Sequence, residues 1–392
     1  MLSKYEIKKI FGAKLVLVMI IINFLFGVVY SYHDYIIHHN ATQTDMTGDK
    51  VYQSCLGNYS QEKLDILQNY VAENWEVMER EGDSKDKRIY SKYSDLMAKA
   101  INISDVMQYR KTVSDNAGRL IESEKGYYKK LNKKIKKMYS PEVSLKIREG
   151  NVGDEITGFF IVTGPVDALS IIFLIVISFY IFLVEHKNGT FELIFSSFAG
   201  RGKIYINKVT AAMLMAVMVS ILQTISTVLL LPLTGGMNEL FDAVQSTALF
   251  AKSPYNINIL ELIIIVTLLR TIGYMVLESI FVFISLFFKR NIIPMAINLL
   301  LGLGLYWIVY YGSGTYVTYS GVGIRRYAFH SIAKFLSPIE LIRYAEGYLW
   351  SFKVVNIAGY PVTEITVAVC INVFIIFLLG ILGYHVYLRR WR

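Results

Sequence analysis

The consecutive stretches SIIFLIVISFYIFLVE, HKNGTFELIFSSFAGRGKIYINK and VTAAMLMAVMVSILQTISTVLLLPL, which together make residues 170–233, decide the fold. Two long apolar runs enclose a short amphipathic segment of mixed charge, from Glu185 to Lys208. Because roughly 20 apolar residues suffice to cross the hydrocarbon of a bilayer, each run predicts a membrane-spanning helix. A structured segment of this kind between two spans indicates that something on that side of the membrane binds it.

Apolar runs of spanning length occur six times along the 392 residues, at about 15–32, 157–184, 208–232, 258–288, 292–311 and 364–388. Charged residues make up 18% of the chain, against about 25% in soluble domains. The first run could be a signal peptide, but no small-residue cleavage site follows it, and its exit VVYSYHDYIIHH carries aromatic residues suited to a membrane interface. We therefore expect an uncleaved anchor and an all-α polytopic membrane protein with six transmembrane helices.

Lysines and arginines in short loops orient the spans, because such residues stay on the cytoplasmic side of a membrane. With six spans, four basic clusters fall on one side: the lysines before the first span, the loop 185–208, the link FKRN (288–291) and the final LRRWR (388–392). The loop 233–257 holds a single cation, Lys252, and falls on the other side. Both termini are therefore predicted to be cytoplasmic, in the cell membrane.

The segment 33–156 then forms an extracellular domain between an N-terminal segment with the first span (1–32) and a five-span core (157–392). It holds 20 Lys+Arg and 20 Asp+Glu, so the net charge of +9 comes from the membrane part and reports topology rather than nucleic-acid binding. Apolar residues at three- and four-residue steps predict helices over 61–80, Tyr93–Met107 and Gly118–Tyr139. The basic run YYKKLNKKIKKMY (127–139) is either a solvated face or a contact with anionic lipid headgroups or an acidic ligand.

The sequence shows no persuasive catalytic or metal-binding signature. It lacks the phosphate-binding pattern G-x-x-x-x-G-K-[ST] and the zinc pattern H-E-x-x-H. His38 and His39 are adjacent, so on a helix they point in different directions. Cys55 lies outside and Cys370 lies in the sixth span, so no disulfide joins them, and Cys55 is either buried or paired between chains. We expect no catalytic residue, no metal and no cofactor in this chain.

Three ionisable residues, Asp167, Arg270 and Glu278, lie inside apolar runs. Each is costly when it faces lipid, so each should face protein or a water-filled cavity. Counting about 1.5 Å per residue from the outer end places Asp167 and Arg270 at similar depths, so we predict that they approach each other or pair with other polar groups. Arg270 and Glu278 are eight residues apart and should share a face of the fourth span. The three residues either fix helix packing or line a substrate path or gate.

Two further features concern the second half of the chain. The fourth run is too long for an upright span, so it should tilt, bend near Gly273 or project beyond the bilayer. The segment of about 328–352, AFHSIAKFLSPIELIRYAEGYLW and the residues after it, is amphipathic, and Ser337-Pro338 starts a new helix within it. It is predicted to be a helix at the outer interface or a re-entrant hairpin.

These features resemble the membrane subunit of a bacterial ABC-2-type ATP-binding-cassette transporter. The likeness rests on the six spans, the large insert after the first span, and Ser337-Pro338 ahead of the last span. The chain departs from the family where Phe198-Ala199-Gly200 replaces a frequent proline, which leaves the end of the loop helix open. The more specific matches lie in the loop after the second span: Glu185, Gly189-Thr190, Leu193, Ser196-Ser197, Gly200-Arg201 and Lys203.

The resemblance implies that residues of about 187–199, including Gly189, form a coupling helix that docks into a separate cytoplasmic ATPase, which carries the ATP and Mg. The residues themselves support a docking surface, because Phe191, Ile194, Phe195 and Phe198 form an apolar stripe that needs a protein or a bilayer surface to cover it. Glu185 and Arg201 flank this helix and could cap or orient it.

By that resemblance the chain is a permease subunit that exports an amphiphilic substrate, such as a peptide, an antibiotic or a lipid-like compound, and works beside a second permease half, identical or related. Two alternatives stand beside it. One is a ligand-sensing or immunity membrane protein whose extracellular domain recognises the ligand. The other is a membrane-embedded enzyme such as an acyltransferase, which would need a polar cluster with a nucleophile. A neighbouring ATPase gene would favour transport.

Overall fold

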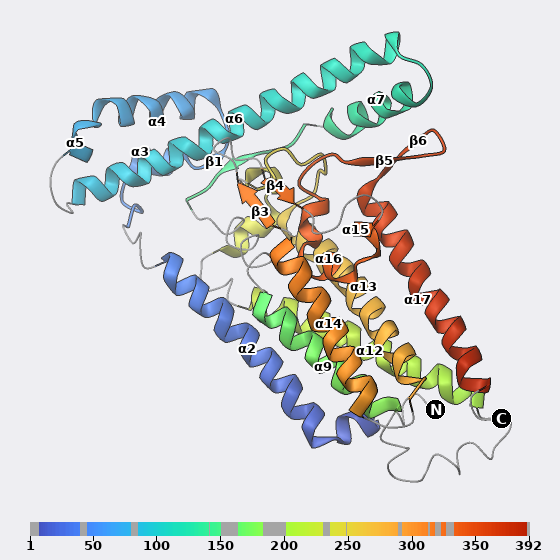
Figure 1. Ribbon diagram of the computed structural model, residues 1–392. Helices are drawn as coiled ribbons and strands as arrows, with labels where there is room; N and C mark the ends of the chain where they lie inside the picture. Colours follow the sequence, from blue (N-terminus) through green and yellow to red (C-terminus); the bar gives the residue numbers. More distant parts are fainter. Residues whose placement is uncertain are drawn as a thin grey trace.

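The protein is described here from a computed structural model, which is mostly helical and consists of a membrane bundle with a smaller helical domain over one end (Figure 1). The all-α polytopic fold predicted from the sequence is confirmed. The residues that the structure describes are 8–39, 45–79, 85–140, 142–149, 164–182, 201–229, 236–247, 249–288, 292–312, 314–317, 323–326 and 333–389.

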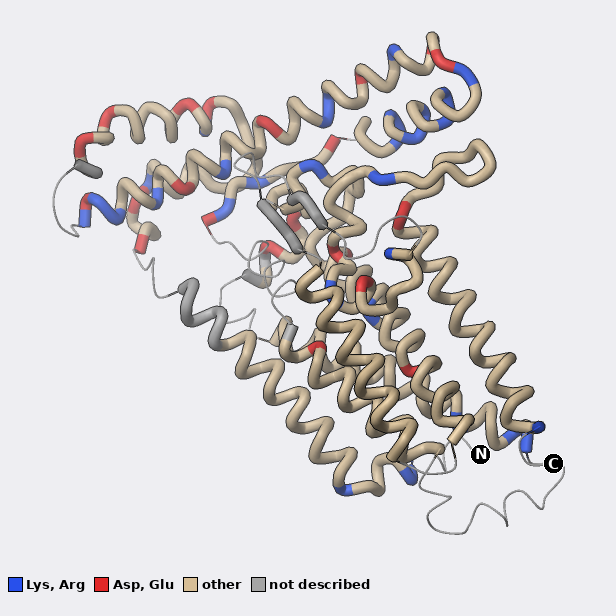
Figure 2. Tube along the Cα trace, in the orientation of Figure 1, with Lys and Arg blue, Asp and Glu red and all other residues tan. Residues whose placement is uncertain are grey.

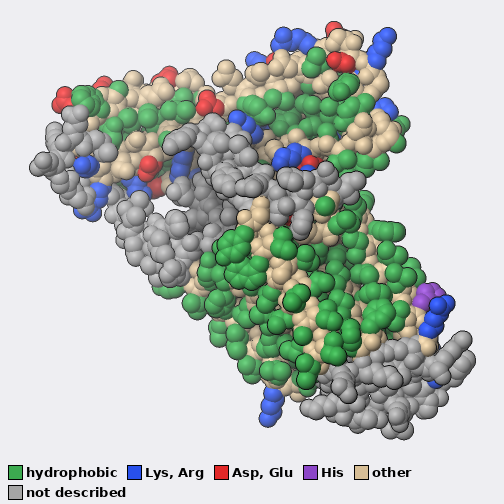
Figure 3. Space-filling view, in the orientation of Figure 1, with side chains coloured by type: hydrophobic (Ala, Val, Ile, Leu, Met, Phe, Trp, Pro, Cys, Tyr) green, Lys and Arg blue, Asp and Glu red, His purple; other side chains and the backbone are tan. Residues whose placement is uncertain are grey.

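Within these residues, six helices are long and apolar enough to cross a membrane. Figure 1 places the start of the first and the end of the last at the same end of the bundle, opposite the smaller domain. Charged residues gather over that domain and at the opposite end, and few lie between (Figure 2). Hydrophobic side chains cover much of the face of the bundle that Figure 3 shows. The six helices are α2 (Lys14–His39), α9 (Gly164–Phe182), α12 (Arg201–Val228), α13 (Ile259–Ser285), α14 (Ile292–Gly312) and α17 (Glu364–Arg389).

The bundle is built around α9 and α13, whose apolar side chains form most of one buried cluster with α12 and α14. Helix α13 starts at a capping box in which Asn258 and Glu261 satisfy each other's backbone amides. It then runs unbroken past Gly273. A Cβ at this glycine would lie 2.8 Å from the carbonyl oxygen of Pro338, so the glycine admits a neighbouring segment rather than breaking the helix.

That neighbour is the segment 333–350, which is three short helical pieces rather than one amphipathic helix: α15 (Ala333–Leu336), α16 (Pro338–Arg343) and η4 (Ala345–Tyr348). Residues 337–350 are all buried. Since α16 packs at Gly273, near the middle of α13, the segment enters the bundle instead of lying on its outer edge. This is the arrangement that a re-entrant segment requires, in which irregular backbone is covered by protein.

The domain at the end of the bundle is called the exterior domain here (residues 45–149) because it lies outside the six membrane helices, and it is helical around a core that includes Tyr52, Leu67, Tyr93 and Ile103. Cys55 is buried in this core. Its strands pair antiparallel, with Gly57 opposite Ile147. Its elements are α3 (Lys50–Cys55), β1 (Gly57–Asn58), α4 (Gln61–Glu73), α5 (Glu76–Glu79), α6 (Lys85–Ser123), α7 (Gly126–Tyr139) and β2 (Lys146–Ile147).

The predicted helix boundaries in this domain were wrong in three places. The predicted helix over 61–80 is two helices, α4 and α5. The helix predicted over Tyr93–Met107 extends to 39 residues, because Arg110, Ser114 and Ala117 continue its buried stripe with polar or small side chains that hide the apolar period. The helix predicted from Gly118 starts instead at Gly126, whose φ of 58° makes the turn between α6 and α7.

The remaining elements form the connections at the end of the bundle next to the exterior domain, which we call the outer end. Strands β5 and β6 form a hairpin whose turn residues Ala358 and Gly359 both have positive φ, as a tight two-residue hairpin turn requires. This hairpin leads directly into α17 at Glu364. The elements are η2 (Gly236–Phe241), η3 (Val244–Ser246), β3 (Gly314–Val317), β4 (Gly323–Arg326), β5 (Val354–Ile357) and β6 (Tyr360–Thr363).

Candidate functional site

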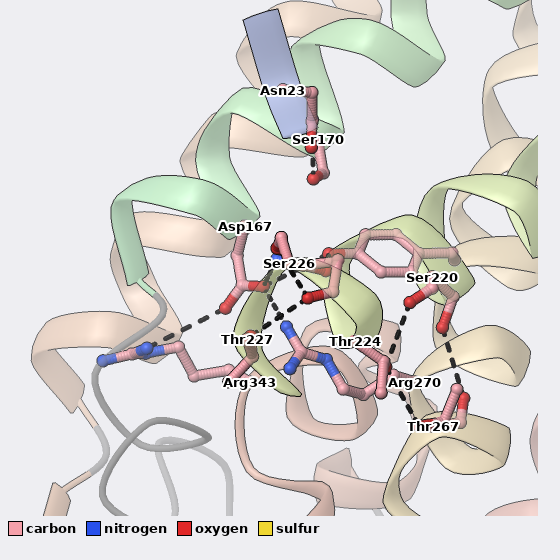
Figure 4. A network of polar contacts seen from close by, with 12 residues as sticks. Asn23, Asp167, Ser170, Ser220, Thr224, Ser226, Thr227, Thr267, Arg270 and Arg343 are labelled. Atoms are coloured by element: carbon pink, nitrogen blue, oxygen red, sulfur yellow. Dashed lines mark hydrogen bonds and ion pairs between the residues drawn. The ribbon is translucent and has the colours of Figure 1, made fainter. Parts of the chain in front are cut away.

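The intramembrane site is centred on Asp167, in the first turn of α9, whose side chain is completely buried. Its Oδ1 accepts hydrogen bonds from Nη2 of Arg270 on α13, at 2.5 Å, and from Nε2 of Gln223 on α12, at 2.6 Å. Its Oδ2 lies 3.8 Å from Nη1 of Arg343 on α16. Figure 4 shows the carboxylate between the two arginines. The predicted approach of Asp167 and Arg270 is therefore confirmed, and Asp167 joins four elements.

Tyr274, one turn after Arg270 on α13, completes this cluster. Its hydroxyl lies 2.7 Å from Oε1 of Gln223 and 3.2 Å from Oδ1 of Asp167. A hydroxyl has one proton, so it donates to one of the two acceptors at a time, and the shorter distance favours Gln223. We call Asp167, Gln223, Arg270, Tyr274 and Arg343 the inner junction. All five side chains are buried.

A row of hydroxyl groups continues the inner junction along the contact between α12 and α13. The Thr271 hydroxyl donates to Oγ of Ser220 at 2.9 Å. The hydroxyls of Thr224 and Thr267, both labelled in Figure 4, are 2.9 Å apart. Small polar side chains let membrane helices approach closely and hydrogen-bond across their contact. On the opposite side, Nδ2 of Asn23 on α2 donates to Oγ of Ser170 on α9 at 2.9 Å. Polar contacts thus hold α2, α9, α12 and α13 together at one level.

Glu278 is also fully buried, two turns after Arg270 on α13, and both residues contact α9. Its Oε1 accepts a hydrogen bond from Oγ of Ser178 at 2.7 Å, whereas its Oε2 has no hydrogen-bond partner among the described residues. The two residues share the buried side of α13, as predicted, but they bind different parts of α9.

Lys208 was counted from the sequence as a cation of the cytoplasmic loop, but the structure buries it, with 1% of its surface exposed. Its Nζ donates at 2.8 Å to the carbonyl oxygen of Ile181, in the last turn of α9. A cation here satisfies a carbonyl group at the end of the helix and complements the helix dipole. Lys208 thereby ties α12 to the end of α9.

The predicted coupling residues Glu185, Gly189, Phe191, Ile194, Phe195 and Phe198 lie outside the described residues, so their placement stays a prediction. Arg201 is the first residue of α12. The segment they belong to connects Phe182, the last residue of α9, with Arg201, and Lys208 contacts α9 about two turns after Arg201 on α12.

A second charge cluster joins the exterior domain to the outer end of the bundle. Asp242, after η2, accepts a 2.6 Å hydrogen bond from Nε of Arg148 and a 2.9 Å one from Nζ of Lys146. Burial raises the pKa of the Asp242 carboxyl, but the hydrogen bonds and charges of the two cations lower it by more. The pKa therefore lies below its ordinary value. We call Lys146, Arg148 and Asp242 the outer junction.

Arg110 on α6 links the exterior domain to the segment 333–350. Its Nη1 donates to the carbonyl oxygen of Ser253 at 3.0 Å, and its Nη2 donates to Oδ1 of Asn256 at 2.6 Å. The Ser253 hydroxyl in turn donates to the carbonyl oxygen of Leu349 at 2.7 Å. A continuous chain of hydrogen bonds therefore runs from α6 to the buried segment that carries Arg343. Sequence reasoning missed Gln223, Tyr274, Arg343 and this chain. The only sequence signal for these residues was a polar side chain standing within an apolar run.

Among the described residues no group of histidine, cysteine and acidic side chains could hold a metal ion. Asp167 binds Arg270 directly and lies near Arg343, whose Nε and Nη1 have no hydrogen-bond partner among the described residues. The arrangement can fix helices in place, and it presents no exposed nucleophile.

Comparison with known proteins identifies the class. The profile of the family described as ABC-2 family transporter protein matches residues 1–391, so the chain belongs to this family of transporter membrane components. No curated protein and no solved structure matches the chain. The family and the six membrane helices together define a multi-pass membrane protein of the permease type.

Proposed function

We propose that this chain is the permease subunit of an exporter driven by a separate cytoplasmic ATP-binding-cassette ATPase, with both termini in the cytoplasm. The match of the transporter family over residues 1–391 is the observation that carries the proposal. The basic clusters, which the positive-inside rule assigns to the cytoplasm, support the orientation.

The segment after α9 is the proposed contact with the ATPase, through the apolar stripe of Phe191, Ile194, Phe195 and Phe198. A push on this segment reaches α9 and α12 together, because the segment connects them and Lys208 ties them. It would reach α13 and α16 through Asp167, which contacts both. In this proposal the ATPase binds ATP and Mg, and this chain supplies the path of the substrate through the membrane.

The proposed substrate is amphiphilic, such as a peptide, an antibiotic or a lipid-like compound, and two permease halves enclose it. The two halves are identical or related chains. The apolar exterior of the bundle supports lateral contact with lipid or with a second half (Figure 3).

Affinity purification of the detergent-solubilised protein tests this proposal. The wild type should retain an ATP-binding-cassette ATPase, and Phe195→Asp should lose it, because a charge is placed in the apolar stripe. Phe195→Leu keeps an apolar side chain and should retain the ATPase. Glu185→Ala should retain an intermediate amount of the ATPase, because it loses a side chain that is expected to cap or orient the coupling helix. If no ATPase accompanies the wild type, the proposal is refuted.

One observation favours a second function, that of a ligand-sensing or immunity protein. The hydrogen bonds from Arg110 through Ser253 to Leu349 give the exterior domain a direct connection to the segment that carries Arg343. Ligand binding outside would then be relayed to the bundle. If the protein senses a ligand, Arg110→Lys, which loses the two-pronged contact, should abolish the effect of the ligand on the activity of the partner ATPase. The activity of that ATPase without ligand should stay unchanged.

A further inference from the structure

Helix α7 carries six lysines in 14 residues and no acidic residue. Lys129, Lys133 and Lys136 follow one another at four- and three-residue steps, so they line one side of the helix. All three are exposed. We call these three residues the lysine row.

Two other lysines of α7 have a structural role instead. Lys130 lies over the ring of Tyr360, with 3.4 Å between its Nζ and the ring centroid. Lys134 donates to the carbonyl oxygen of Pro361 at 2.9 Å. Both contacts fix α7 on the β5–β6 hairpin. Lys129 and Lys133 are exposed beside them, and the exposed Lys136 extends its side chain past Gly118 of α6, with Nζ 3.4 Å from the position of a Cβ there.

The lysine row has no counter-charge in the part of the chain that the structure describes. The acidic residues nearest in sequence, Glu122 and Glu124 at the end of α6, form no ion pair with it, and neither does any other described carboxylate. Cations near a helix start and like charges four residues apart are both unfavourable. The side chain of Lys125, at the N-cap of α7, makes no capping hydrogen bond. When a helix carries such unfavourable charges and nothing in the described chain compensates them, the charges point to a function.

We propose that the lysine row binds an extended polyanion in the aqueous phase outside the membrane. Three ammonium groups spread over about 10 Å of helix match several neighbouring anionic groups better than one. Lysine binds phosphate as a point charge, without the fixed geometry of arginine, which suits a flexible polymer. The hairpin lies between α7 and the start of α17, so α7 stands beyond the end of the last membrane helix (Figure 1).

This site goes beyond the proposed transport function and stands whether or not an ATPase binds the chain. Its occupancy would reach the bundle, because the hairpin fixed by Lys130 and Lys134 continues into α17 at Glu364. The bound polymer would then act on α17 from outside.

Titration of fluorescent long-chain polyphosphate onto the full-length protein, in nanodiscs of zwitterionic lipid, tests the site. The triple variant Lys129→Gln, Lys133→Gln, Lys136→Gln should weaken binding about tenfold or more and reduce its salt dependence. The control variant Lys50→Gln, Lys85→Gln, Lys111→Gln removes the same charge from exposed positions elsewhere in the exterior domain and should change the affinity less than about threefold. Equal melting temperatures of the three proteins show that the fold is kept.

Two results would overturn the proposal. The first is weak, unsaturable binding by the wild type, or an equal loss in both triple variants, which would mean that only net charge matters. The second comes from a measurement with anionic lipid vesicles. If the triple substitution changes the association of the protein with these vesicles but not its binding of polyphosphate, the row contacts a membrane and not a polymer.

Discussion

The inner and outer junctions have the same ionic composition, one aspartate with two cations, and differ in how much water reaches them. At the inner junction the side chains of Asp167 and Arg270 are 0% and 2% exposed. At the outer junction Asp242 is 2% exposed, but Lys146 and Arg148 are 32% and 33% exposed. Charges in a low-dielectric interior cannot lose a partner cheaply, whereas water and salt screen the exposed ones. The bundle is therefore held as a fixed unit, while the exterior domain is held by a contact that solution conditions can weaken.

Removal of the inner carboxylate should have the largest effect. Asp167→Ala leaves Arg270 buried without its partner, which costs roughly 3 to 5 kcal/mol when a buried ion pair is broken. We expect lower expression and a lower melting temperature in detergent. Asp167→Asn keeps two hydrogen-bonding atoms and should lose less. Normal stability and normal transport in Asp167→Ala would show that the inner junction neither holds the bundle nor gates it.

Overpacking the segment 333–350 should have the next largest effect. A Cβ in Gly273→Ala would meet the Pro338 carbonyl oxygen and the Ile342 side chain, both at 2.8 Å, so α16 must shift. The expected destabilisation is about 1 to 3 kcal/mol, measured as the midpoint of thermal unfolding. Gly304→Ala is the matched control, since nothing lies within 4 Å of its Cβ. An identical midpoint for both variants would place α16 away from α13.

The outer junction should respond more weakly. Asp242→Asn removes the charge that both cations bind, and we expect a loss of about 0.5 to 1.5 kcal/mol, because the solvent compensates the two cations, which are 32% and 33% exposed. The loss should be confined to the exterior domain, as faster proteolysis there with no change in the bundle. Asp115→Asn, at an exposed position of α6, serves as the control. Loosening of the bundle by Asp242→Asn would remove the distinction between the junctions.

The outer junction should also fail in acid. The folded pKa of Asp242 is lowered below its ordinary value of 3.8, so its contribution is complete above that pH and is lost as the pH falls through the folded pKa. Contacts of the exterior domain should therefore hold at neutral pH and weaken below about pH 4. In Asp242→Asn this part of the pH dependence should be missing. Protease accessibility measured against pH in both proteins makes the comparison.

Substitution of Lys130 should have the smallest effect. Lys130→Met removes the contact with the Tyr360 ring, a loss of about 0.5 to 1 kcal/mol for an exposed cation–π pair. Lys129→Met, on the open side of α7, should leave the stability unchanged. Hydrogen exchange of the β5–β6 hairpin reads out the difference. Equal protection in both variants would mean that Lys130 does not hold α7 on the hairpin.

The fold was more predictable from the sequence than the site. Apolar length identified all six spans, because the thickness of the bilayer sets a strict limit on it. The orientation that charge bias predicts stays a prediction. Depth counting paired Asp167 with Arg270, since both sit on helices with a fixed rise. Gln223, Tyr274 and Arg343 were missed, because their meeting depends on side-chain direction and on the segment 333–350, which hydropathy does not place. The predicted boundaries of α6 were wrong because Arg110 and Ser114 occupy core positions and interrupt the apolar pattern.

Hydrogen–deuterium exchange of the full-length protein in nanodiscs, at low salt and at about 1 M salt, tests most directly whether the two junctions differ. The screening length falls to roughly 3 Å at 1 M. We expect faster exchange at high salt at residues 142–149 and 236–247, around the outer junction, with no change in α13 around Arg270. Equal acceleration at both junctions, or at neither, would contradict this expectation.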